Sequence, residues 1–214
     1  MENYQVINMR NDTYPQNTVS ALIETDLVTF ETRQVLRERI EREETAKPSF
    51  FDNETFITLR AVCNRLIPGT DTGKAVDVAG CLDSVLAEGK GNGWRYDQMP
   101  PDDKAYLSGL RGIDETAEIM FGEAFKLLDA THQDRVLISI QDNTAAGKTW
   151  ETIPAHLFFE ELLASVVEFY YSHPSAKEEI GEVAMADAKG WQRIGLNELE
   201  AHEPKVLNTK MNVR

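Results

Sequence analysis

The sequence has few cysteines, few basic residues and no long apolar run, and each shortage excludes a class of protein. Its 214 residues include two cysteines, Cys63 and Cys81, too few for a disulfide-rich scaffold, a four-thiolate zinc site or a haem attachment motif. No run approaches the roughly 18 apolar residues that a membrane-spanning helix needs. Thirty-six acidic residues against 22 basic ones give a formal net charge of -14, which repels phosphate backbones. We therefore expect neither a membrane span nor a nucleic-acid partner.

An export signal is also missing from the start of the sequence. The segment MENYQVINMRNDTYPQN has no basic region followed by an apolar one, and it has no twin arginines. We therefore expect a cytoplasmic protein, or a periplasmic one if a partner carries it across the membrane.

Apolar residues recur at helical spacing along most of the chain. Hydrophobic residues make up 42% and charged residues 27%, as in ordinary soluble folded proteins. No segment shows the sustained alternation that is typical of strands. The pattern predicts an all-α fold, a single compact multi-helix domain with extended N-terminal and C-terminal arms.

Each predicted helix has a recognisable start or end. The first begins at Asp26, and the second begins at an N-cap on Asp52. The third predicted helix carries Val78 to Val85 and has Gly89 beyond its end, and the fourth carries Leu107 to Met120. The fifth carries Val136 to Ile140 and follows a capping-box pattern at Thr131 and Asp134. The last covers residues 154–172.

Three segments follow from these patterns. Residues 1–48 are predicted to be an N-terminal arm plus the first helix, and to wrap around a partner. Within them, residues 1–25 mix Asn, Thr, Gln and Tyr without a clear period, which indicates an extended arm that orders only against something else. Residues 49–200 form the helical domain, and residues 201–214 form a C-terminal arm.

No arrangement of residues predicts a catalytic, cofactor or metal site in this chain. The loop Gly69–Ala75 lacks the spacing of a phosphate-binding loop, and Gly89, Gly91 and Gly93 do not complete a dinucleotide fingerprint. Both segments are interpreted as connections between helices. His156 has Glu160 and Glu161 one helical turn away, where a metal or acid/base pair fits sterically, although a solvated helix face explains the spacing equally well.

Two pairs of alternatives stay open at this stage. Cys63 and Cys81 lie on neighbouring predicted helices, so a disulfide worth about 3 kcal/mol is feasible. In a reducing compartment they would be buried free thiols. Tyr170, Tyr171 and Trp191 combine apolar area with polar atoms, as interface anchors do, but the same residues would also cover the end of a helical core.

Four segments in order resemble a known family. They are RLIPGTD, YLSGLRGIDETAEIMFGEAFKLLDATHQDRVL, FFEELLASVVEFYYSHP and GWQRIGLNE. This order and spacing, over about residues 50–200, resembles the gluconate 2-dehydrogenase subunit 3 family. The sequence departs from it by having SHPSAKEEIG where many members have a glycine-rich stretch.

The resemblance implies a non-catalytic small subunit of an FAD-dependent sugar dehydrogenase. Its partner would be a catalytic flavoprotein of the glucose-methanol-choline type, acting on gluconate, glucose or a glucoside, as in a glucoside 3-dehydrogenase. The small subunit would have a chaperone-like role in folding, stability and flavin loading, within a heterodimer or larger assembly that can include a cytochrome c subunit. The alternative is a stand-alone helical protein that binds a small ligand.

Six residues are predicted to bind the partner, because they are large apolar anchors or belong to the resembling segments. They are Tyr170, Tyr171, Pro174, Trp191, Ile194 and Gly195.

Overall fold

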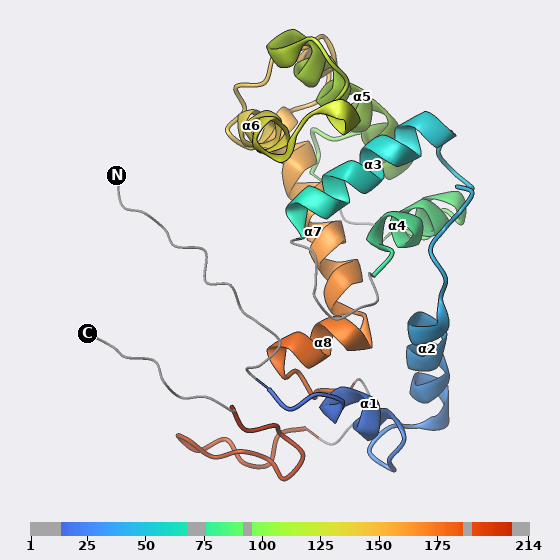
Figure 1. Cartoon of the computed structure of the whole chain (residues 1–214), viewed down its shortest axis with the longest axis vertical. Coiled ribbons are helices and arrows are strands. Elements are labelled where there is room, and N and C mark those ends of the chain that lie inside the picture. Colours follow the sequence, from blue (N-terminus) through green and yellow to red (C-terminus); the bar gives the residue numbers. More distant parts are fainter. Residues whose placement is uncertain (1–13, 68–75, 92–95, 186–189, 207–214) are drawn as a thin grey trace. The chain divides into compact units, whose positions relative to one another are not determined.

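The structure is a computed structural model that describes residues 14–67, 76–91, 96–185 and 190–206. All the regular elements in these residues are helical, with eight α-helices, two short 3-10 turns and no strand (Figure 1). The all-helical prediction is therefore confirmed. The outer parts of both predicted arms, residues 1–13 and 207–214, lie outside the described residues, as do the loop Gly69–Ala75 and Gly93.

The chain forms two compact units. The central unit comprises residues 43–69 and 77–170, and the terminal unit comprises residues 1–42, 70–76 and 171–214. The terminal unit thus combines the two ends of the sequence, and the central unit is inserted between them.

The central unit is built from five α-helices and two 3-10 turns. They are α3 (Asn53–Leu66), α4 (Val78–Ala87), α5 (Asp102–Phe121), η1 (Phe125–Leu127), α6 (Ala130–Gln141), η2 (Thr149–Glu151) and α7 (Ala155–Tyr171), whose last residue is assigned to the terminal unit. Helix α3 packs against α4, α5 and α6, and α5 also packs against α6 and η2. All five helices contribute buried apolar side chains to the interior of this unit.

Aromatic rings occupy much of that interior. Phe158 is fully buried, and its ring contacts Tyr106 edge to face at 5.9 Å and Trp150 at 6.0 Å between ring centroids. Such aromatic contacts add to the stabilisation from burial alone. Gly109 on α5 permits this packing, since a Cβ atom there would lie 2.2 Å from the Phe158 ring.

Helix caps in this unit explain where the helices begin and end. The Asp52 carboxylate accepts a hydrogen bond from the Thr55 amide at 2.8 Å, which confirms the predicted N-cap. The predicted capping box at Thr131 is wrong by two residues, because Asp129 is the N-cap of α6 and accepts from the His132 amide at 2.9 Å. Gly89 lies just beyond α4 with φ +62°, as predicted.

The terminal unit contains three helices, α1 (Thr18–Ile23), α2 (Phe30–Glu41) and α8 (Pro174–Ile180). Helix α8 contacts both α1 and α2, and Figure 1 shows α8 in orange beside α1 in blue. The apolar contacts are small clusters of three buried residues, and the partly buried Met185 packs against both clusters. One cluster is Val19, Leu22 and Val183, and the other is Ile23, Val28 and Leu36.

Two predictions for this unit are wrong in detail. Helix α1 lies inside the segment that was expected to be an extended arm, because a helix of six residues is too short to show a helical period. The helix that was expected to begin at Asp26 begins at Phe30, and Thr29 is its N-cap, since the Thr29 side chain accepts from the Thr32 amide.

Side chains bound to backbone atoms connect the pieces of the terminal unit. The Glu178 carboxylate on α8 accepts hydrogen bonds from the Thr18 and Ser20 amides of α1 at 3.1 and 2.9 Å. It thereby caps the N-terminus of α1. Asn17, at the N-cap position, has φ +64° and makes no side-chain hydrogen bond there. A carboxylate at the positive end of the helix dipole is stabilising.

His173 joins α8 to α2 in the same way. Its Nδ1 atom accepts from the Ser175 amide at 3.1 Å, so the ring proton lies on Nε2, which donates to the Arg39 carbonyl at 2.9 Å. The Arg39 guanidinium in turn donates to the Ser172 carbonyl at 2.7 Å. The segment SHPSAKEEIG therefore contains a capped helix with partners on α2.

Candidate partner-binding surface

The structure separates the six predicted partner-binding residues into buried and exposed groups. Tyr170 is 5% exposed, and Pro174 is buried at the first position of α8. Burial favours the core alternative for these two side chains. Tyr171 is 40% exposed and Trp191 is 49% exposed, so both rings retain surface that a partner can cover.

The most exposed apolar residues follow Trp191. We call residues 190–200 the Trp191 loop; it contains no helix. Ile194 is 86% exposed and Leu196 is 93% exposed. Single exposed apolar residues are ordinary, but three large apolar residues exposed within six positions of one loop are a feature of interaction sites. The loop therefore presents apolar area that a binding partner can bury.

Hydrogen bonds give the Trp191 loop a defined shape. The Glu200 carboxylate oxygen Oε1 accepts from the Gln192 amide at 2.5 Å and from the Arg193 amide at 2.6 Å. The Glu200 amide donates to the carboxylate of Glu203. The pKa of Glu200 lies below its ordinary value. The largest cause is the hydrogen bond from the Arg193 amide, and the second is that from the Gln192 amide. The carboxylate therefore stays ionised at neutral pH and holds the loop together.

Gly195 shapes the turn at the tip of this loop. The Glu198 amide donates to the Gly195 carbonyl at 3.1 Å. A Cβ atom on Gly195 would lie 2.8 Å from the Glu198 side chain, so glycine allows a close approach within the turn. The structure thus gives Gly195 a role in positioning its exposed neighbours.

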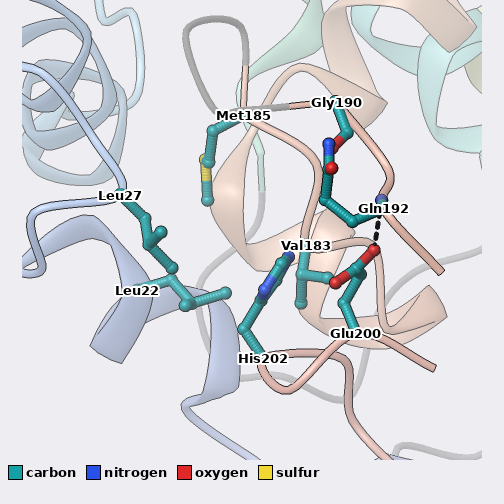
Figure 2. Close-up of a pocket in the computed structure, with 8 residues that line it drawn as sticks. All are labelled: Leu22, Leu27, Val183, Met185, Gly190, Gln192, Glu200 and His202. Atoms are coloured by element: carbon teal, nitrogen blue, oxygen red, sulfur yellow. Dashed lines mark hydrogen bonds between the residues drawn. The ribbon is translucent and has the colours of Figure 1, made fainter.

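A pocket of about 180 Å3 lies beside the Trp191 loop within the terminal unit (Figure 2). Its lining residues come from both ends of the chain: Leu22, Leu27, Val183, Met185, Gly190, Gln192, Glu200 and His202. The His202 ring also stacks on Trp191, with 6.2 Å between centroids and 14° between planes. The pocket and the exposed loop are therefore adjacent parts of one surface.

The sequence interpretation missed most of this surface. Leu196, Glu200 and His202 carry no pattern that separates them from ordinary surface residues. The only sequence signal near them was the resemblance of GWQRIGLNE to the family, which identified Trp191, Ile194 and Gly195.

The structure does not bring His156, Glu160 and Glu161 together around one point. His156 Nδ1 lies 3.1 Å from Asn143 Oδ1, and the Tyr96 hydroxyl donates to the Glu160 carboxylate. Glu161 is buried, and desolvation raises its pKa. Among the residues that the structure describes, no group of three His, Cys, Asp or Glu side chains is arranged to hold a metal ion.

Cys63 and Cys81 lie on α3 and α4, which contact each other as expected of neighbouring helices. They do not form a disulfide with each other, and Cys63 is buried while Cys81 is partly exposed. Burial raises the pKa of the Cys63 thiol to about 12, which makes it a poor nucleophile.

Comparisons with known proteins identify the family. Within the described parts of the chain, none of the helices is long and apolar enough to cross a membrane. Searches of curated proteins and of solved structures gave no match. The family model described as gluconate 2-dehydrogenase subunit 3 matches residues 53–197, which is 145 of 214 residues and includes Trp191, Ile194 and Gly195. The chain therefore belongs to the gluconate 2-dehydrogenase subunit 3 family, whose members are subunits of larger complexes.

Proposed function

We propose that this chain is the non-catalytic small subunit of an FAD-dependent dehydrogenase that oxidises gluconate, glucose or a glucoside. Its partner is a catalytic flavoprotein of the glucose-methanol-choline type, which holds the FAD. The small subunit assists the folding, stability and flavin loading of that partner. Family membership supports an accessory role, since the family is one of subunits.

The exposed Trp191 loop is the observation that carries this proposal. Ile194 and Leu196 leave almost all of their side-chain area in water. Burying a side chain of this size contributes about 1.5–3 kcal/mol. Because Glu200 fixes the loop before binding, less conformational entropy is lost when the partner docks. A preformed loop with exposed apolar side chains is therefore suited to a stable interface between subunits.

The proposed complex is a heterodimer or a larger assembly, which can include a cytochrome c subunit. The acidic net charge of -14 suits a partner surface with basic residues. We place the complex in the cytoplasm, or in the periplasm if the chain is exported together with a partner.

Purification of the tagged chain from its native host tests the proposal. We expect a yellow complex with flavin absorption and a larger co-purifying chain. In the variant Ile194→Asp, a charge replaces the exposed apolar side chain, and we expect at least about tenfold less co-purified flavoprotein. Ile119→Asp is the matched control, because Ile119 is also well exposed, at 61%, but lies on α5 of the central unit.

The same purification separates the proposal from the alternative of a stand-alone small-ligand binding protein. That alternative predicts a colourless, folded monomer. Recovery of the wild-type chain without any flavoprotein, under conditions that preserve weak complexes, would contradict the accessory role.

A further inference from the structure

The pocket beside the Trp191 loop has apolar walls and one carboxylate. Leu22, Leu27, Val183 and Met185 supply aliphatic and thioether surface, and Figure 2 shows these side chains around the same space as Glu200 and His202. Glu200 is the carboxylate among these lining residues, and a purely apolar occupant would add no hydrogen bond to it. The lining therefore suits a group that is apolar along its length and polar at one end.

The second carboxylate oxygen of Glu200 can accept a further hydrogen bond. Its two amide donors among the described residues both bind Oε1. Figure 2 shows the other carboxylate oxygen turned away from the Gln192 bond, toward the side of the pocket where Val183 lies. The Arg193 guanidinium donates to the Leu199 carbonyl at 3.4 Å, and the charges of His202 and Arg193 also act on the Glu200 carboxylate, after the larger effect of the two amide donors. The carboxylate can therefore accept a charged hydrogen bond from outside the chain.

The size of the pocket limits the occupant to about one side chain. Its volume is about 180 Å3, close to the ~150 Å3 of an apolar protein cavity that holds a benzene molecule. A lysine or arginine side chain meets both requirements, because it has an aliphatic stem and a cationic end. Charge complementarity favours it further, since the chain carries a net charge of -14.

We propose that this pocket receives one lysine or arginine side chain of the catalytic subunit. Its stem packs against Leu22, Val183 and Met185, and its cationic end binds the Glu200 carboxylate. This inference rests on the proposed function, and it adds the chemistry of the contact next to the apolar Trp191 loop.

The variant Glu200→Gln tests the inference within the intact complex. Glutamine keeps a carbonyl oxygen that can accept from the Gln192 and Arg193 amides, but it removes the charge. We expect the catalytic subunit to dissociate about tenfold faster from the tagged Glu200→Gln chain than from wild type in low salt. The difference should shrink in high salt, since screening weakens the wild-type ion pair.

Glu198→Gln is the control, because Glu198 lies in the same exposed loop, undergoes the same charge change and does not line the pocket. Equal dissociation rates for the Glu200→Gln and Glu198→Gln complexes would overturn the inference. A larger effect of Met185→Gln than of Glu200→Gln would also overturn it, because that result indicates an apolar occupant.

Failure of the wild-type chain to retain any flavoprotein is a different result. It contradicts the accessory role itself, whereas equal rates in an intact flavoprotein complex contradict only the cationic contact.

Discussion

The two units of this protein are stabilised in different ways. The central unit has many fully buried apolar side chains, among them Phe125, Phe158 and Leu162. In the terminal unit, the apolar clusters have three buried members each, and charged side chains bound to backbone atoms join the helices. Burial contributes in proportion to area. We therefore expect the terminal unit to open at a lower free energy than the central unit.

This difference matches a division of roles. A well-packed unit folds on its own contacts, whereas a unit with few buried apolar residues gains more from a partner that covers it. The Trp191 loop and its pocket both lie in the terminal unit. Binding of the proposed catalytic subunit there would thus stabilise the part of the molecule that we expect to be less stable.

The largest expected loss of stability comes from removing a large buried side chain from the central unit. Phe158→Ala removes a fully buried ring and its contacts with Tyr106 and Trp150. We expect a loss of about 3–5 kcal/mol in the free energy of unfolding of the central unit, measured in urea. Phe30→Ala is the control, because Phe30 is 64% exposed on α2 and its loss should change stability by less than about 0.5 kcal/mol. Equal losses would contradict the comparison of the two units.

A smaller, local effect is expected in the terminal unit. The Arg33 guanidinium donates to the carbonyls of Ile23, Thr25 and Val28 at 2.7, 2.6 and 3.1 Å. Arg33→Gln should lower the opening free energy of this segment by about 2 kcal/mol, because bonds from a charged donor are lost. Hydrogen exchange of the amides in residues 23–28 measures this change.

Arg37→Gln is the matched control for Arg33, since it removes a second arginine from α2. Arg37 pairs only with the exposed Glu24 carboxylate among the contacts that the structure describes, and exposed pairs contribute little. Faster exchange throughout the central unit in Arg33→Gln would show that the two units do not open separately.

The smallest expected effect is a pH dependence in the central unit. The pKa of Cys63 rises from 9.0 to about 12 on folding because the thiol is buried. Between these values the unfolded chain has lost the thiol proton and the folded chain has kept it, so stability falls as pH rises above 9. We expect a loss of about 1 kcal/mol between pH 7.5 and 9.5 in wild type that is absent in Cys63→Ala. Equal pH profiles of the two proteins in urea would contradict this role.

Long helices were predictable from sequence because each buries one face over several turns. Asp52, Gly89 and the apolar residues of α5 and α7 gave clear signals of this kind. Helices α1 and α8 gave none, since six and seven residues span about two turns or fewer. Contacts between residues distant in sequence stabilise these helices instead. Glu178 of α8 binds α1, and His173 at the start of α8 binds α2.

The candidate site was predictable only in its exposed part. Trp191 and Ile194 belong to a segment with a family resemblance, and their exposure agrees with a binding role. Tyr170 has the same amphipathic chemistry, but tertiary packing buries it. The pocket could not be predicted, because Leu22 and Val183 are brought together only by the fold.

The order of synthesis has a consequence for a pocket lined from both ends of the chain. Leu27 precedes the central unit in sequence and His202 follows it, so the ribosome adds the whole central unit before the pocket can close. At ~5–20 residues per second, this interval lasts about 10–35 s. A partner that requires the closed pocket would therefore recognise only chains that have been translated past His202, and shorter nascent chains would not compete for it.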